Sequence, residues 1–532
     1  MGIYLNPGNS GFEKIIQRDY QDKTGLISLI NRGINSTGNL VCISRPRRFG
    51  KSFAAKMLCA YYDCSCDSHA LFEKYEISRD ASYERHINQY NVIYLDIAAF
   101  LSRIITDNIP VSEFVIRLKA ALYAELIAEC PELEAQSDLT NCMRAYAERT
   151  NRKFVFIIDE WDAVIREAKH DTKIQTLYLN LLRGWFKNGN FTDAVVAAAY
   201  MTGILPIKKD GSQSAISDFR EYSILNPNRF AEYTGFTEKE VKALCEHYNM
   251  DFALAKHWYD GYSFAQSGSI YNPYSVMMAM DSGEYGSYWK RTSAAESLMT
   301  YIDLEIGTGH SELQTKIVKL IAGEHLEIDV SDFENDFQTF KSDDDVLTLL
   351  VHLGYLAYDE ESNRVRIPNE EVRTEFDSLL KKKTHSKLSA LVMQSERLLE
   401  DTLSGNGEAV ADAIKQIRET NYAPQYYNNE QSLRYAVKFA YIVCIDRYMK
   451  VEELPSGNGL ADIVYLPNRN TALPALVVEL KWQESADAAI KQIKANNYPA
   501  ILKDYCGDIV LVGINYDSKT KQHSCKIEQI TK

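Results

Sequence analysis

Two apolar runs, each followed by polar residues of a particular kind, constrain this chain most. Residues 40–43 (LVCI) lead into a turn that closes with Gly50–Ser52 (GKS), and residues 154–158 (FVFII) end in Asp159–Glu160. Short apolar runs next to turn residues are typical of buried strands. Polar groups that follow such strands lie at the carboxyl edge of a sheet, where α/β proteins bind ligands. The two runs therefore predict one site.

A nucleoside triphosphate with Mg²⁺ needs the groups found here. Backbone N–H groups at a helix N-terminus that begins after Gly50 would cradle phosphates. Lys51 would reach the β and γ oxygens, while Ser52 and Asp159 would hold the metal. Glu160 would orient or polarise the attacking water. The pattern predicts ATP and Mg²⁺ as ligands.

Each string alone is weak support for nucleotide binding. The pattern G-x-x-x-x-G-K-[ST] requires Gly where Arg45 stands, GKS is common by chance, and an acidic pair also marks the exposed end of a strand. Both strings in the right order favour a nucleotide site. Arg45, Arg47 and Arg48 are then either a solvated turn or extra phosphate neutralisers. Phe49 is expected to pack the loop against the sheet.

Composition sets outer bounds on the protein. With 532 residues, three or four domains are expected, and the net charge of −14 argues against indiscriminate coating of nucleic acid but not against a local basic groove. Scattered cysteines, no signal pattern and no membrane-length apolar run predict a cytoplasmic protein without a membrane partner. Cys64, Cys66 and His69 lack a second ligand pair, so a surface turn is favoured over zinc.

Residues 1–235 alternate apolar runs with helical segments, which predicts an α/β fold with a mostly parallel sheet. Strands are expected at 39–44, 91–97, 153–159 and 194–202, and helices at 52–63, 111–129 and 172–187. Thr202 ends the last strand, where it is equally well a γ-phosphate sensor or a strand cap. Arg220 and Arg229 are weak candidates for an arginine reaching a neighbouring subunit's phosphate, and surface salt bridges are favoured for them.

The middle of the chain reads as smaller modules. Thr237 and Glu240 form a capping-box pattern, which predicts a helical lid over 236–285. Gly261 is expected to supply an unusual backbone angle beside aromatic residues that form a small core. Residues 286–390 read as helices followed by short strands around 355–369, which suggests a winged-helix module. The lysines at 381–383 are more often a solvated helix end than a nucleic-acid patch.

The C-terminal third contains a second group of charged residues. Strands are expected at 461–466, 475–482 and 508–516, with a helix after the second. Glu479 and Lys481 are two apart on a strand and so share one face. In that place Lys481 would position a water molecule or offset charge in a transition state.

The spacing of the hairpin predicts a partner for Glu479. A symmetric turn about residues 470–471 pairs Leu466 with Ala475 and places Asp462 opposite Glu479, with Cβ atoms about 5 Å apart. Two facing carboxylates repel, and a divalent cation would relieve the repulsion and generate hydroxide. The motif E-x-K is also common in exposed cross-strand salt bridges. On chemistry alone the two interpretations are about even.

A series of motifs in collinear order goes beyond these residues. RPRRFGKS, IDEWD, YLNPGNSGF, DKTGLI, TGI, GFTEKEV, WYDGYSF, YNPYSV, LGYL and IPNEEV resemble bacterial AAA-ATPase-like proteins with a C-terminal PD-(D/E)XK nuclease-like domain. The resemblance covers nearly the whole chain. It implies a P-loop NTPase core of the AAA/ASCE type at residues 1–235 and a lid at 236–285. It also implies a winged-helix-like linker at 286–390 and a nuclease-like α/β domain at 391–532.

The resemblance also implies roles for single residues. It places the phosphate loop on Gly50, Lys51 and Ser52 and the acidic pair on Asp159 and Glu160. It places the nuclease motif on Asp462, Glu479 and Lys481, with a metal-binding acid of the preceding helix at Glu430 and a following Gln at Gln492. Family members usually show G-R-x-D before the first nuclease strand, whereas residues 459–462 read GLAD. That departure removes a nucleic-acid contact but leaves the metal ligands.

Two functions follow from this pattern. The first is an ATPase coupled to a nuclease that uses Mg²⁺ or Mn²⁺ and acts on DNA more than on RNA, with a homo-oligomer allowed. The second is a nucleotide-gated interaction protein whose nuclease fold is a silent scaffold. A role in defence or nucleic-acid processing is an analogy with the family.

Overall fold

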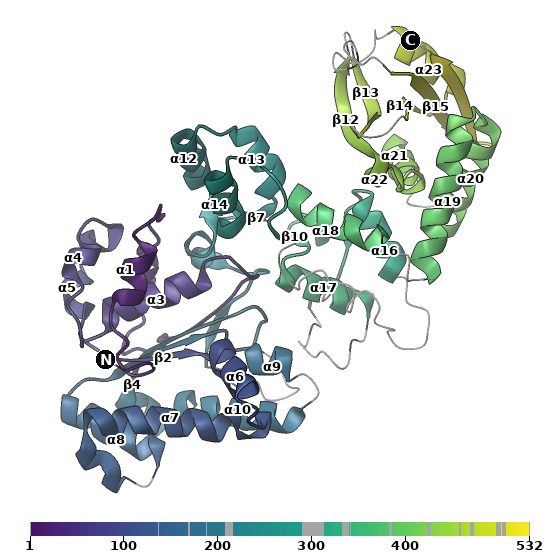
Figure 1. The fold of residues 1–532 in the computed structure, drawn as a ribbon. Helices are drawn as coiled ribbons and strands as arrows, with labels where there is room; N and C mark the ends of the chain where they lie inside the picture. Colours follow the sequence, from purple (N-terminus) through teal and green to yellow (C-terminus); the bar gives the residue numbers. More distant parts are fainter. Residues whose placement is uncertain are drawn as a thin grey trace. The chain divides into compact units, whose positions relative to one another are not determined.

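The computed structural model describes residues 2–530 apart from 137, 169–170, 188, 208–215, 217, 290–312, 332, 334–339, 341, 382–385, 423–426, 457–458, 469–472, 496–501 and 503–506. The chain forms two compact units, Met1–Arg291 with Glu327–Glu371, and Thr292–Leu326 with Val372–Lys532 (Figure 1). The four predicted domains would divide these two units further, and this division stays a prediction.

The N-terminal unit is built on a parallel five-stranded sheet in the order β2-β3-β4-β1-β5. This confirms the α/β class and the parallel sheet. Its strands are β1 (Leu40–Ser44), β2 (Asn91–Asp96), β3 (Phe154–Asp159), β4 (Val196–Gly203) and β5 (Arg220–Tyr222). All four predicted strands are present. The short edge strand β5 was not predicted, because three half-exposed residues give no apolar pattern.

Helices cover both faces of this sheet. Successive side chains of β3 alternate between two cores: Phe154, Phe156 and Ile158 join one, and Val155 and Ile157 join the other. Burial on both faces explains the unbroken apolar runs. Figure 1 shows the two helical layers. One contains α6 (Ile97–Thr106), α7 (Phe114–Glu129), α8 (Leu139–Thr150), α9 (Ala163–Glu167), α10 (Thr172–Phe186) and α11 (Gly189–Val195), and the other contains α1 (Ser10–Ile15), α2 (Gly25–Asn31), α3 (Lys51–Tyr62), α4 (His69–Phe72) and α5 (Tyr83–His86).

The register of the sheet gathers polar groups at its carboxyl edge. Ile43 lies beside Thr202, Ser44 lies beside Gly203, and Asp159 ends β3. Because β4 stands between β1 and β3, Thr202 comes between the phosphate loop and the acidic pair. The sequence predicts the strands but not this order.

Residues 236–285 contain helices and also a small sheet. The capping box of Thr237 and Glu240 is present, as predicted. The strands, in the order β6-β8-β7, were not predicted; β7 comes from the first aromatic motif, and Tyr271 of the second motif ends β8. The elements are β6 (Phe236–Thr237), α12 (Glu238–Tyr248), α13 (Phe252–Tyr259), β7 (Tyr262–Phe264), β8 (Gly268–Tyr271) and α14 (Pro273–Ser282).

The described part of 286–390 contains the predicted hairpin. Its strands β10 (Ala357–Asp359) and β11 (Arg364–Arg366) are antiparallel. Other elements here are α16 (Leu313–Ile321), β9 (Leu326–Glu327), α17 (Asp343–Leu353) and α18 (Glu370–Lys381). The boundary between the two compact units crosses this segment, and the winged-helix assignment stays a prediction. Lys381 ends α18, and residues 382–383 lie outside the described residues.

The C-terminal unit contains a second five-stranded sheet in the order β12-β13-β14-β15-β16, in which only β14 and β15 are parallel. Its elements are α19 (Ser386–Leu403), α20 (Gly407–Asn421), α21 (Glu430–Ala440), α22 (Cys444–Arg447), β12 (Tyr448–Ser456), β13 (Gly459–Pro467), β14 (Ala475–Trp482), α23 (Ala486–Ala495), β15 (Ile509–Asp517) and β16 (Gln522–Ile530). The edge strands β12 and β16 were not predicted. The side chains of β16 are half-exposed and mostly polar, which hides the strand pattern.

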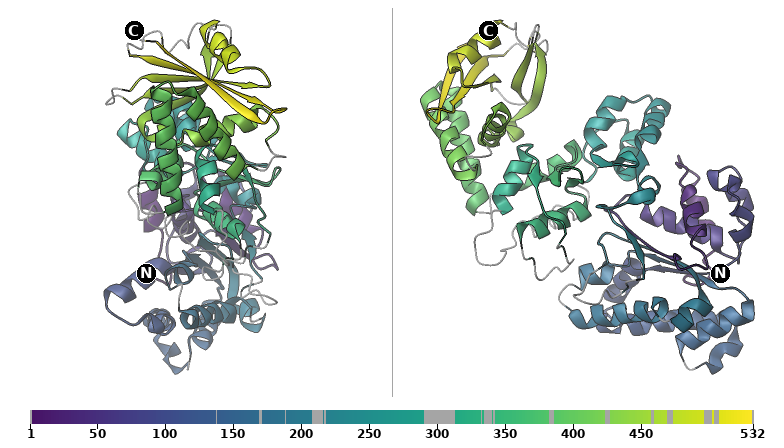
Figure 2. Two further views of the ribbon diagram at one scale, coloured as in Figure 1. Left: turned by 90° about the vertical axis from the view of Figure 1, so that its right-hand side faces the viewer. Right: turned by 180° about the vertical axis from the view of Figure 1, so that it is seen from behind.

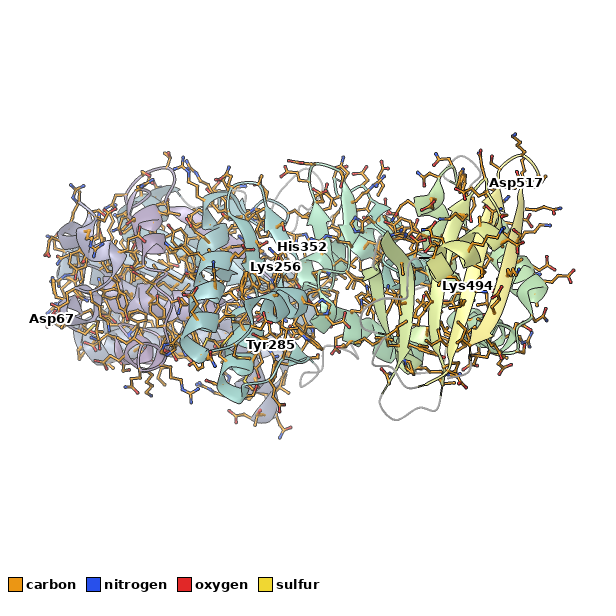
Figure 3. All side chains as sticks on the ribbon, turned by 90° about the horizontal axis from the view of Figure 1, so that it is seen from above. Asp67, Lys256, Tyr285, His352, Lys494 and Asp517 are labelled. Carbon is orange, nitrogen blue, oxygen red and sulfur yellow. The ribbon has the colours of Figure 1, made fainter. Side chains whose placement is uncertain are left out.

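Helices pack on this sheet as well (Figure 2). Helix α23 crosses Gly513, where a Cβ would stand 2.5 Å from the carbonyl oxygen of Ala486, so only glycine allows the close approach. Figure 3 labels Lys494 on α23 and Asp517 at the end of β15. Helix α20 packs on β16. Across the described residues, no helix combines the length and apolar character required to cross a membrane.

One glycine of the N-terminal unit tests the packing between its segments. Gly261 has φ +128°, as its predicted unusual angle requires, and a Cβ there would stand 2.1 Å from the carbonyl oxygen of Pro368. We expect Gly261→Ala to destabilise this unit by about 2 kcal/mol or more, because strain and a backbone clash add. The control is Gly283→Ala, which has φ +69° but open space and should cost about 1 kcal/mol. Equal thermal unfolding midpoints for the two variants would contradict the clash.

Candidate functional site

The loop between β1 and α3 has the geometry of a phosphate cradle. Gly50 precedes α3 with φ +83°, and Arg48 also has a positive φ, of +71°. These left-handed residues turn the chain so that the N-terminus of the twelve-residue helix α3 faces a cavity of about 1070 Å³. Unpaired N–H groups and the helix dipole favour an anion there.

Lys51, the first residue of α3, is buried beside the loop. Its Nζ donates to the carbonyl oxygens of Arg45 at 3.0 Å and Pro46 at 2.9 Å, and lies 4.0 Å from Glu160 Oε1. Burial lowers the pKa of the Lys51 ammonium, and the carboxylates of Glu160 and Asp159 oppose this effect. The ammonium is therefore held at the floor of the cavity.

Asp159 is buried at the end of β3, and only part of its hydrogen-bonding capacity is used. Its Oδ1 accepts from the Thr202 hydroxyl and, at 3.1 Å, from the Glu160 amide. Burial raises the pKa of Asp159, while hydrogen bonds from Ser52 and Thr202 lower it. Asp159 Oδ2 has no hydrogen-bond partner among the described residues. A hydroxyl and a carboxylate with a spare oxygen fit the hard oxygen ligands that Mg²⁺ prefers.

The arginines of the loop divide into three environments. Arg45 is buried and donates to the carbonyl oxygens of Ser44 and Tyr222, which contradicts a solvated turn at this residue, while its neutralising of phosphate stays a prediction. Burial lowers its pKa to about 9. Arg48 lines the cavity and lies 3.9 Å from the ring centre of Tyr274. Arg47 is exposed.

Two further expectations near the loop need correction or refinement. Phe49 is buried and packs edge-on to Tyr262 of β7, and its predicted packing against the main sheet stays a prediction. Arg220 pairs in register with Val41, at the start of β1, and is thus remote from the carboxyl edge. Arg229 is exposed. Neither arginine joins the site in its own subunit.

Part of the cavity lining is aromatic and aliphatic, and it alternates with charged residues such as Arg18 and Asp281. Phe53, on α3, is 55% exposed although it is a large apolar residue. Further apolar lining residues are Tyr20 of the N-terminal segment, Phe236 of β6, and Tyr274, Met277 and Met278 of α14. A lining with cations beside the loop and with apolar side chains suits a ligand that carries both phosphates and a base.

The second predicted site, in the C-terminal unit, does come together. The ladder pairs Ile463 with Val478 and Tyr465 with Leu476, which is the predicted register. Continued by one residue, it places Asp462 opposite Glu479. The predicted centre of the turn, residues 470–471, lies outside the described residues.

Hydrogen bonds connect the residues of this second site. Lys481 Nζ donates to Glu479 Oε1 at 3.1 Å, and the Leu480 amide donates to Asp462 Oδ2 at 2.8 Å. Arg434 of α21 donates to Asp462 Oδ1. Burial and then the neighbouring Asp462 raise the pKa of Glu479 to about 7. Two acids thus face two cations.

The remaining predicted residues of this site are less engaged. Glu430 is exposed at the start of α21, and Gln492 is half-exposed on α23. Across the described ranges, no three His, Cys, Asp or Glu side chains are grouped to hold a metal. Glu430 therefore does not complete a three-acid cluster with Asp462 and Glu479, and Cys64 with Cys66 forms none either.

Sequence reasoning missed three charged residues that hold the predicted ones. Asp162 and Arg166 stand beside Glu160, and Arg434 stands beside Asp462. The spacing of Asp162 and Arg166 is a signal that could have been used, because residues four apart share a helix face. Arg434 gave no such signal, since its partner comes from a distant strand.

Comparison with known proteins supports the N-terminal assignment. Residues 7–212 match a family model described as predicted AAA-ATPase, which supports ATP binding by this part of the chain. No curated protein sequence matches the chain. The match ends before residue 213, so everything said of the C-terminal unit rests on its own geometry.

Two solved structures show remote similarity. Cdc6p from Pyrobaculum aerophilum is 9% identical, with 68% of this chain and 94% of that chain covered and a TM-score of 0.24. The ORC2 protein of Aeropyrum pernix, solved as ADPNP–ADP complexes, is 11% identical, with 68% and 95% covered and a TM-score of 0.25. Similarity at this level carries no argument, and the fold assignment rests on the sheet and its edge.

The raised pKa of Glu479 gives a stability prediction. The folded state binds the Glu479 proton more tightly than the unfolded state between its ordinary pKa of 4.5 and about 7. The free energy of unfolding should therefore fall as pH rises through this window, by at most about 3 kcal/mol before solvent screening. Glu479→Gln should flatten this dependence in chemical denaturation with a chelator present. The exposed Glu419→Gln should follow the wild type, and parallel curves for all three proteins would contradict the prediction.

Proposed function

We propose that the N-terminal unit binds and hydrolyses ATP with Mg²⁺. The observation that carries this proposal is that Lys51, Ser52 and Glu160 line one large cavity, with the buried Asp159 in hydrogen-bond contact with Ser52. The family match over residues 7–212 supports it. The apolar residues of the cavity lining would hold the base.

Each side chain has a distinct task in this proposal. Lys51 would exchange its two carbonyl contacts for the β- and γ-phosphate oxygens, and Arg48 would contact phosphate from the lid side. Ser52 and Asp159 would hold Mg²⁺, which neutralises charge on the phosphates when bound. Glu160 would accept a hydrogen bond from the attacking water. Thr202 would hold Asp159 in place rather than sense the γ-phosphate, because its hydroxyl already donates to that carboxylate.

A second function is proposed for the C-terminal unit. Asp462, Glu479 and Lys481 would bind a divalent cation and cleave a phosphodiester of DNA or RNA. The register that joins the two acids favours this function. The scaffold alternative is favoured by Arg434, which together with Lys481 already balances both carboxylates without a metal. A metal would have to displace Arg434 from Asp462.

Two substitutions test ATP hydrolysis. We expect Lys51→Ala to abolish ATP–Mg²⁺ binding in calorimetry, because the phosphates lose their main cation. Glu160→Gln should bind ATP normally and lose about 10²-fold or more in kcat, since only water activation is removed. Lys56→Ala, which changes another lysine at the cavity, should keep turnover within a few-fold. Equal kcat values for Glu160→Gln and wild type would remove Glu160 from the mechanism.

Nicking of plasmid DNA with Mg²⁺ or Mn²⁺ tests the second function, with RNA as a parallel substrate. Asp462→Ala, Glu479→Ala and Lys481→Ala should each remove cleavage while leaving ATP hydrolysis intact. Activity should fall steeply with salt, because an acidic chain must guide its substrate by local cations. If the wild type cuts neither nucleic acid with or without ATP, and calorimetry detects no metal binding, the scaffold alternative holds.

A further inference from the structure

One arginine that has no task in the proposed mechanism contacts Glu160, the residue that orients the attacking water. Arg166 lies on α9, with a side chain that is only 10% exposed. Its Nη2 donates to Glu160 Oε2, and its Nε donates to Asp162 Oδ2 at 3.0 Å. A planar guanidinium that bonds two carboxylates through different nitrogens has a fixed direction as well as a fixed place.

Asp162 makes this arrangement rigid. It is fully buried, and the same Oδ2 accepts from the backbone amides of Ile204 at 3.1 Å and Leu205 at 2.9 Å. These amides follow directly on β4. The guanidinium is therefore anchored, through Asp162, to the strand that separates the phosphate loop from the acidic pair.

Glu160 has an unusual backbone and a second cation nearby. It has φ +53°, in the left-handed region that non-glycine residues rarely adopt, and its carboxylate is partly exposed. Its other oxygen lies 4.0 Å from Lys51 Nζ. Once phosphates attract Lys51, Arg166 is the described cation that still holds Glu160.

We propose that Arg166 is a positioning residue that holds the Glu160 carboxylate where it accepts a hydrogen bond from the water that attacks the γ-phosphate, an inference that rests on the proposed ATP hydrolysis. Arg166 is not among the described residues that line the cavity, whereas Glu160 is. Arg166 therefore acts through Glu160 and not on the nucleotide. Asp162 supports it from behind.

The expected effect is on turnover and not on binding. Arg166→Ala should lower kcat for ATP about 10- to 100-fold, because a misplaced general base loses most of its advantage. The affinity for ATP–Mg²⁺ in calorimetry should stay within about 2-fold of wild type. Arg166→Lys keeps the positive charge but loses the planar guanidinium that donates to two carboxylates, and it should recover part of kcat. The control is Arg144→Ala, which removes an arginine from an exposed pair with Glu148 and should match wild type.

A double-variant cycle separates positioning from general damage. In the Glu160→Gln background, Arg166→Ala should not lower the residual rate further, because the group that it positions is already disabled. A further loss of 10-fold or more in that background would overturn the proposal and show an independent role. An unchanged or increased kcat for Arg166→Ala alone would also overturn it.

Misfolding and failure of the proposed function give different results. Lost ATP binding in both Arg166→Ala and Arg166→Lys, with lowered unfolding midpoints, would assign Arg166 to structure and overturn positioning. A wild type without ATPase activity would instead reject the proposed function itself. Normal wild-type turnover that depends on Glu160 but not on Arg166 would reject only the positioning role.

Discussion

The N-terminal site depends on the buried carboxylate of Asp159. Burial disfavours a charged group unless partners compensate, and here the Thr202 hydroxyl, the Glu160 amide and Ser52 supply them. One oxygen still has no hydrogen-bond partner among the described residues. A cation bound beside Ser52 would relieve that deficit. The same contacts hold β3, β4 and α3 in register around the cavity.

The end of β4 is the common support of the loop and the acids. The amide of Arg45 donates to the Gly203 carbonyl at 3.0 Å, and the Ser44 hydroxyl donates to the Leu205 carbonyl at 2.8 Å. Gly203 cannot carry a side chain, because a Cβ would stand 2.6 Å from Trp161 Nε1. A change at this strand end therefore reaches both halves of the site at once.

The C-terminal unit poses a different electrostatic question. Asp462 and Glu479 are brought together by strand register, and their mutual repulsion contributes to the raised pKa of Glu479. Arg434 and Lys481 form ion pairs with the two carboxylates and so reduce that repulsion. The two carboxylates can bind a metal ion, or they can form ion pairs with Arg434 and Lys481 alone. The competition between a divalent ion and the Arg434 guanidinium for Asp462 decides between these two states.

The sequence alone determined what depends on local spacing. Buried runs predicted the strand that leads into the Lys51 loop and the strand that ends in Asp159, and a symmetric turn predicted the register of Asp462 with Glu479. The tertiary structure decided the strand order, the burial of Arg45, and the pairing of Arg166 and Arg434 with the predicted acids. Periodicity reports which face a residue occupies, but not which element packs against that face. The partner of a charged side chain that lies on another element is therefore known only when segments distant in sequence have been brought together.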